Sequence, residues 1–189
     1  MNNIDKKLLF KLDYLPIGSH YNNLRYFFKK EVWQVIVANV REFKNYQCEF
    51  CKKQFNFENS KSLKYLHCHE LWNFNYEKKW QILKDLLLLC HNCHNCQHIN
   101  FAHLKDKQDQ TFNHFKKVNN LTDAEFNELK TNNLLFRKNY EDKKVISRDE
   151  LDKVDVWFFN MDFNLESIFV NKTNARKIQK FLEQISQIN

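Results

Sequence analysis

Glycine and proline are nearly absent from this chain, which has one residue of each among 189. Tight turns that need a positive φ angle normally use glycine, so few such turns are expected. Hydrophobic residues make up 43% of the sequence and include 18 phenylalanines, which is enough for a packed interior. We therefore expect mostly helices, joined by Asn-rich connections.

Long apolar runs are missing as well. The longest aliphatic run, Leu86–Leu89, is far too short for a membrane span. The first residues, Met1–Asp5, are polar, and Leu8–Phe10 is too short for the apolar core of a signal peptide. These absences predict a cytoplasmic protein with no membrane partner, whose six cysteines are reduced thiols rather than disulfides.

The net charge of +7 is unevenly distributed. Residues 1–105 contain 16 Lys and Arg residues against 9 Asp and Glu residues, whereas residues 106–189 contain 14 of each kind. The basic part also contains all the cysteines and seven of the eight histidines. Charge alone would indicate only a solvated surface, but a basic surface beside metal ligands favours a polyanionic partner such as nucleic acid.

Two short cysteine pairs are the most informative motifs. Cys48-x-x-Cys51 and Cys90-x-x-Cys93 each present two sulfurs on one turn, and together they suit a tetrahedral structural zinc. Cys93-x-x-Cys96 is an overlapping alternative. We prefer Cys90 with Cys93, because this pairing leaves the histidines that follow on a helix. Cys96 and the remaining cysteine, Cys68, are then expected to be small buried residues.

Periodicity predicts the elements before the second pair. A three- and four-residue apolar spacing predicts one helix over residues 22–43, with Asn22 as its cap. The alternation from Leu63 to Leu71 fits a strand with His67 and His69 on the same side.

The next elements are predicted from Glu77 onward. Residues 77–85 look helical, and the apolar run 86–89 predicts a buried strand that leads into the second cysteine pair. From Cys93 onward, His94 and His98 follow helical spacing and lie one turn apart.

The C-terminal third contains helix-start signals but no recognisable chemistry. Thr122 and Glu125 form a capping box, with Ser147 and Glu150 repeating it more weakly. The sequence further predicts an apolar strand or docking segment at 157–163 and an amphipathic helix over 175–188. The expected organisation is an N-terminal helical support at 1–45, a core at 46–105 and a mainly helical region at 106–189.

Taken in order, these motifs resemble the HNH endonucleases, whose core is a ββα-metal finger. The matching residues are Cys48-x-x-Cys51, His69-Glu70, Leu86 to Cys90 with Cys93, and His94 with His98. A narrower similarity is to small prokaryotic HNH-like proteins with a His-Glu-x-Trp segment, here ending at Trp72. The resemblance implies an α+β, mainly helical fold in which a zinc-stapled ββα-metal finger is embedded between N-terminal and C-terminal helices.

The resemblance also implies metal-dependent hydrolysis of phosphodiester bonds in DNA. His69 matches the strand histidine that acts as general base, and Asp85 lies where the family has an asparagine that orients this base. His94 and His98 would bind a catalytic divalent ion, namely Mg²⁺, Mn²⁺, Ni²⁺ or Zn²⁺, in addition to the structural zinc.

Besides Asp85 in place of the asparagine, the chain departs from the family pattern at two further places. The aspartate that commonly precedes the strand histidine is Cys68, and a thiol is a poor ligand for Mg²⁺. Glu70 or His98 would then supply the missing ligand. The usual glycine after the first cysteine pair is Lys52. These changes motivate an alternative function, a zinc-finger module that binds DNA or a protein partner without cleavage.

Lysines around the finger are the expected phosphate contacts, with a solvated surface as the alternative for each. They are Lys52, Lys53, Lys61, Lys64, Lys78 and Lys79. A homodimer is also compatible with the resemblance, because simple cuts of both DNA strands need two active sites.

Overall fold

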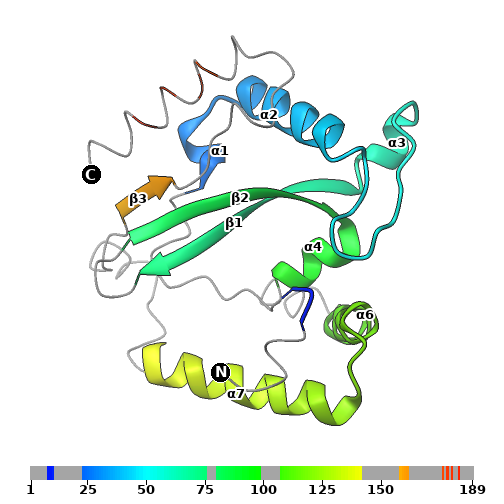
Figure 1. Ribbon diagram of the computed structural model, residues 1–189, viewed down its shortest axis with the longest axis vertical. Helices are drawn as coiled ribbons and strands as arrows, with labels where there is room; N and C mark the ends of the chain where they lie inside the picture. Colours follow the sequence, from blue (N-terminus) through cyan, green and yellow to red (C-terminus); the bar gives the residue numbers. More distant parts are fainter. Residues whose placement is uncertain are drawn as a thin grey trace.

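The computed structural model describes residues 8–10, 23–75, 80–98, 107–141 and 158–161, together with residues 176, 178, 180 and 183 (Figure 1). The elements in chain order are α1 (Leu24–Phe27), α2 (Lys30–Phe43), α3 (Ser60–Leu63), β1 (Leu66–Asn75), β2 (Trp80–Cys90), α4 (His91–Gln97), α6 (Gln108–Asn119), α7 (Asp123–Glu141) and β3 (Phe158–Met161). The mixed α and β character is thus confirmed. The mainly helical content is not confirmed, because the two longest strands form a hairpin at the centre of the described residues (Figure 1).

The sheet has the strand order β1-β2-β3. Strands β1 and β2 are antiparallel, from the pair Leu66 and Cys90 to the pair Asn75 and Trp80, with an irregularity after Leu71. Strand β3 runs parallel to the start of β2. The predicted strand within 157–163 is confirmed by β3, and the buried 86–89 run lies in β2 as expected.

The helix predicted over residues 77–85 is wrong from Trp80 onward, where the chain is β2. Gln81 and Leu83 are buried while Trp80 and Lys84 are exposed, and this period of two matches a strand. Pairing with β1 therefore determines the structure of this segment, although the spacing of its apolar residues also fits a helix. Both predicted ends of the strand over 63–71 are also wrong. Leu63 is the last residue of α3, and β1 begins at Leu66 and continues to Asn75.

The single helix predicted over residues 22–43 is interrupted at Phe28, whose φ of −111° and ψ of 143° are extended. Phe28 is buried in the same cluster as Ile36 and Val40, so the break turns an aromatic ring into the core. The predicted cap, Asn22, lies outside the described residues. Helices α2 and α4 lie on opposite sides of the hairpin (Figure 1).

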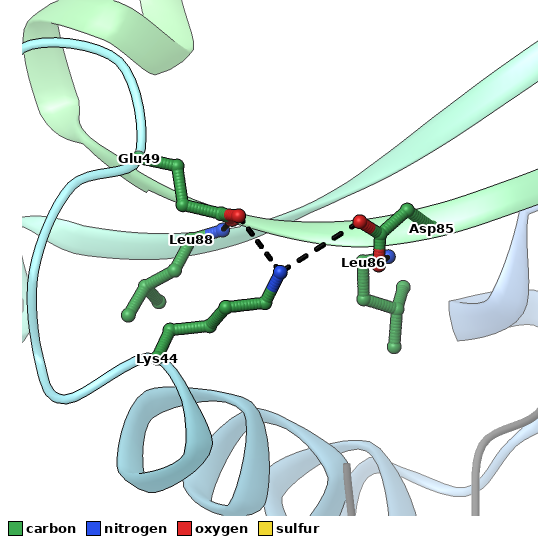
Figure 2. Close-up of polar contacts among 5 residues, drawn as sticks. All are labelled: Lys44, Glu49, Asp85, Leu86 and Leu88. Carbon is green, nitrogen blue, oxygen red and sulfur yellow. Dashed lines mark hydrogen bonds and ion pairs between the residues drawn. The ribbon is translucent and has the colours of Figure 1, made fainter. Parts of the chain in front are cut away.

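A small polar network joins the end of α2 to the first cysteine pair and to β2 (Figure 2). Nζ of Lys44 lies 2.7 Å from Oε1 of Glu49 and 3.7 Å from Oδ2 of Asp85. The backbone N–H of Leu88 donates to Oε2 of Glu49 at 2.7 Å, and the N–H of Glu49 donates to the Leu88 carbonyl at 2.9 Å. Oδ1 of Asp85 accepts from the N–H of Leu86. The first cysteine pair is therefore hydrogen-bonded to the edge of β2.

Helices α6 and α7 form a second apolar cluster beside α4. This cluster contains Phe10, Cys96, Phe115, Leu121, Phe126 and Leu129. The predicted capping box is confirmed, because the N–H of Thr122 donates to Glu125 at 2.7 Å and the N–H of Glu125 donates to Oγ1 of Thr122 at 3.3 Å.

The C-terminal predictions are covered only in part. Of the helix predicted over 175–188, the four described residues are helical, and the rest lies outside the described residues, as do Ser147 and Glu150. Within the part of the chain that the structure describes, no helix is both long and apolar enough to cross a lipid bilayer.

Candidate metal centres

The first cysteine pair lies in a tight loop that forms without glycine. The N–H of Lys52 donates to the Cys48 carbonyl at 3.0 Å, and the N–H of Cys48 donates to the Lys53 carbonyl at 2.9 Å. Lys52 has a φ of 60°, and Asn45 and Tyr46 just before the loop have φ values of 51° and 55°. The chain thus places ordinary side chains in the left-handed region that usually favours glycine.

The second pair lies at the junction of β2 and α4. Cys90 is the last residue of the strand and caps the helix, with its Sγ accepting from the N–H of Cys93 at 3.5 Å. This strand-to-helix junction points both sulfurs at the first loop. The junction is fixed on its other side by Tyr65, whose carbonyl accepts from the N–H of His91 at 2.8 Å.

The four sulfurs of Cys48, Cys51, Cys90 and Cys93 all lie within 4.8 Å of one another. A tetrahedral zinc with Zn–S bonds of about 2.3 Å separates its sulfurs by roughly 3.8 Å. The distance of 3.5 Å between the sulfurs of Cys51 and Cys90 is close to this spacing. These four cysteines could hold a structural zinc, as predicted.

The two remaining cysteines lie outside this group. Sγ of Cys96 is within hydrogen-bonding distance of the Asn92 carbonyl at 3.3 Å, and Cys68 is buried in the core of the hairpin. The preference for Cys90 with Cys93 over Cys93 with Cys96 is therefore confirmed. Burial raises the pKa of the Cys96 thiol to about 12 and also raises the pKa of the Cys68 thiol, so both are protonated at neutral pH.

The thiols of the cysteine group share protons. Hydrogen bonds from Cys90 and Cys93 lower the pKa of Cys48, and the same contacts raise the pKa of Cys90 to about 11 and raise that of Cys93. One thiolate is thus favoured by its neighbours, while ionising several together is opposed by their mutual repulsion. A divalent cation offsets this repulsion, which is the chemistry that such a donor set fits.

His114 contacts the cysteine group from α6, with its Nε2 at 3.1 Å from Sγ of Cys93. Burial lowers the pKa of His114, so the ring is neutral at pH 7. A neutral imidazole with the proton on Nε2 can donate to a thiolate. Sequence reasoning missed this residue, because His114 belongs to no spacing motif and is 21 residues from Cys93.

A second group consists of His69, His94 and His98, whose ligand atoms also lie within 4.8 Å of one another. The ring centroids are 5.3 Å apart for His69 and His94, 4.9 Å for His69 and His98, and 4.6 Å for His94 and His98. Nε2 of His69 is buried and has no hydrogen-bond partner. A buried ring nitrogen of this kind fits a metal ligand, and the histidine group could bind a metal ion.

His69 and His94 are neutral at pH 7. Burial, followed by the charge of His98, lowers the pKa of His69 to about 3 and that of His94 to about 2. Neutral imidazoles keep a lone pair for a cation, so the low pKa values suit metal binding.

Two further histidines extend the group, and sequence reasoning assigned them no role. His67 stacks on His94, with 4.6 Å between ring centroids and 17° between ring planes. Its Nε2 lies 3.4 Å from Nδ1 of His91, the first residue of α4. The strand alternation had already placed His67 beside His69, and that signal alone pointed to it.

The predicted carboxylates lie elsewhere. Glu70 follows His69 on β1, so the two side chains point to opposite faces of the strand. Oε1 of Glu70 accepts from the N–H of Leu24 at 3.0 Å, at the start of α1. Burial raises the pKa of Glu70 to about 7. Asp85 contacts Lys44 in the network described above. The structure therefore brings neither carboxylate among the ligand atoms of the histidine group.

The predicted phosphate-contacting lysines lie on the loop after the first cysteine pair and on and just after α3. Lys52, Lys53, Lys61 and Lys64 are exposed. Nζ of Lys53 lies 5.3 Å from the centre of the Phe55 ring, and that of Lys64 lies 4.8 Å from the Tyr65 ring. Lys78 and Lys79 lie outside the described residues.

Comparisons of the chain with protein-family models, with curated proteins and with solved structures give no match. The resemblance to HNH endonucleases therefore remains a prediction from the motifs of this sequence.

Proposed function

We propose that the protein is a metal-dependent HNH-type endonuclease that hydrolyses phosphodiester bonds in DNA. The observation that carries this proposal is the pairing of two donor groups at the junction of the β1–β2 hairpin and α4. One group has four thiols and the other has three imidazoles. Thiols suit a structural zinc, whereas imidazoles suit an ion that keeps an open position for a substrate. The hairpin followed directly by a helix also supports a ββα-metal finger.

In this proposal His94 and His98 hold the catalytic ion, and His69 acts as general base. A bound divalent cation would polarise the scissile phosphate and stabilise the leaving oxygen. All three imidazoles offer nitrogen and none offers the hard oxygen that Mg²⁺ prefers, so we expect Mn²⁺, Ni²⁺ or Zn²⁺ to be used best. The buried Nε2 of His69 lies where it could accept a proton from water or bind the ion as a third ligand.

The test is a plasmid-cleavage assay with Mg²⁺, Mn²⁺, Ni²⁺ or Zn²⁺, comparing His69→Ala and His94→Ala with the unchanged protein. Asn73→Ala is the matched control, because Asn73 is exposed on the same strand as His69. We expect cleavage to fall by at least 100-fold in both histidine variants, the scale typical of a lost acid–base group. No cleavage with any metal, or full cleavage by both variants, would contradict the proposal.

Metal counting separates the two roles of His69. If His69 is the base, His69→Ala retains the second ion and loses cleavage, whereas His94→Ala loses both. If His69 is a ligand, the two variants lose the second ion alike.

One observation favours a second function, a zinc-finger module that binds DNA or a protein partner without cleavage. The histidine group has no carboxylate among its ligand atoms, and Cys68 stands where the family commonly has aspartate. Such a module would bind one zinc per chain and no second ion at neutral pH. A nuclease would bind a second ion that is lost in His94→Ala.

A further inference from the structure

A polar cleft of about 470 Å³ lies between α4 and α6. From α4 it is lined by His91 and Asn95, and from α6 by Asn113 and His114, with Lys107 and Lys117 toward its two ends. Among the described residues that line the cleft, none is acidic. Its walls therefore offer positive charge and amide groups to an anion.

The spacing of the two lysines favours an extended anion. Lys107 directly precedes α6 and Lys117 lies in its last turn, so the two lysines are ten positions apart, which is about 15 Å of helix axis. Both side chains are exposed. A single phosphate would contact both only with the two side chains extended toward each other, whereas an extended anion can contact each of them separately. Along a nucleic-acid strand, charges repeat at about 3.4 Å of axis, so a few successive phosphates fit the span.

The cleft adjoins the histidine group through a chain of imidazole contacts. His91, which lines the cleft, lies 3.4 Å from His67, measured from Nδ1 to Nε2. His67 in turn stacks on His94 at 4.6 Å between ring centroids. A strand held in the cleft would therefore pass close to the proposed catalytic ion.

His114 separates the cleft from the thiols. It lines the cleft and also contacts Sγ of Cys93 at 3.1 Å, so its ring stands between a bound anion and the sulfur. This placement reduces the repulsion that thiolate charge would otherwise exert on a phosphate.

We propose that the cleft between α4 and α6 binds the phosphate backbone of a nucleic-acid strand, with Lys107 and Lys117 contacting separate phosphates. The choice of nucleic acid as the ligand rests on the proposed function, but binding in the cleft does not require cleavage.

The test measures binding of labelled single-stranded and duplex oligonucleotides to the full chain, without added divalent ions, over a range of salt concentrations. The variant is Lys107→Ala with Lys117→Ala. The control is Lys29→Ala with Lys30→Ala, an equal loss of charge from exposed lysines at the start of α2, across the hairpin from α6 (Figure 1). Zinc content verifies that each variant is folded.

Loss of two phosphate contacts should reduce the slope of log affinity against log salt by about 1.4 for single strands and 1.8 for duplexes. At 0.1 M salt this corresponds to a loss of affinity of roughly tenfold or more, with the control pair unchanged. Equal losses in both pairs, or no loss in either, would overturn the proposal. So would inorganic phosphate, a nucleoside monophosphate or polyglutamate that competes as well as an oligonucleotide does.

The outcome is independent of the nuclease assay. Cleft-dependent binding with no cleavage would leave this proposal standing and overturn the nuclease. If the protein cleaves and binds DNA, and neither activity changes when Lys107 and Lys117 are replaced, the proposal for the cleft fails while the proposed nuclease function stands.

Discussion

Nε2 of His114 lies 3.1 Å from Sγ of Cys93, which links α6 directly to the cysteine group. The two residues come from different helices, so this contact also helps to hold α6 against α4. A donor to a metal-bound thiolate reduces the charge on sulfur and orients the ligand.

We therefore predict that His114→Ala lowers zinc affinity by about 10- to 100-fold without changing the stoichiometry, which is the usual effect of losing such a partner. Competition with a chromophoric chelator measures the affinity. Asn113→Ala, at the exposed neighbouring position on α6, is the control and should bind zinc as the unchanged protein does. Equal affinities for the two variants would show that the contact does not support the metal.

Cys93 belongs to the cysteine group and Cys96 does not, although the two are three residues apart in α4. We therefore predict that serine substitutions at these two positions have different effects on zinc binding. Cys93→Ser should lose zinc and, because metal binding of this kind is coupled to folding, cooperative thermal unfolding as well. Cys96→Ser should retain one zinc per chain. Burying its hydroxyl should lower the free energy of unfolding by about 1–3 kcal/mol, and no more, because this hydroxyl can donate to the Asn92 carbonyl.

Metal content and thermal unfolding measure both variants. Zinc loss from Cys96→Ser, together with its retention in Cys93→Ser, would reassign the fourth ligand.

Local spacing predicted two short turns that present cysteine pairs, and the choice of Cys90 over Cys96 as the partner of Cys93 came from the histidines that follow. Alternation along β1 likewise placed His67 and His69 together. Spacing failed to predict features that depend on contacts between elements far apart in the sequence. Residues from Trp80 onward fit a helix and a strand equally well until β1 is present to pair with them. The break at Phe28 has neither glycine nor proline to signal it, and His114 reaches Cys93 only because α6 packs on α4.

The backbone angle of Lys52 leads us to predict that replacing this residue with glycine stabilises the protein. Its φ of 60° lies in the left-handed region, which costs a non-glycine residue about 1–2 kcal/mol. Glycine removes this cost but adds conformational entropy to the unfolded chain, so Lys52→Gly should raise the free energy of unfolding by roughly 0.5–1 kcal/mol.

Lys53→Gly is the matched control, because Lys53 is also exposed and has no positive φ. It should lower the free energy of unfolding or leave it unchanged. Chemical denaturation measures both variants, and a loss of stability in Lys52→Gly would contradict the prediction.

Glu70 predicts a pH-dependent effect on stability. Burial raises the pKa of its carboxyl group from 4.5 to about 7, so the folded state disfavours the ionised form. Below pH 4.5 the group is protonated in both states and adds no cost. The cost develops as pH rises from about 4.5 and is complete above about pH 7. Glu70→Gln keeps an oxygen for the N–H of Leu24 and carries no charge.

The free energy of unfolding of Glu70→Gln, relative to the unchanged protein, should therefore rise between pH 5 and pH 8. Denaturation at several pH values measures this difference, and taking a difference removes the titration of the nearby histidines, which is common to both proteins. Glu58→Gln, at an exposed position, should show no such trend. Parallel pH profiles for Glu70→Gln and the unchanged protein would mean that the carboxylate is already accommodated by the N–H of Leu24 and the charge of Arg25, both of which lower its pKa.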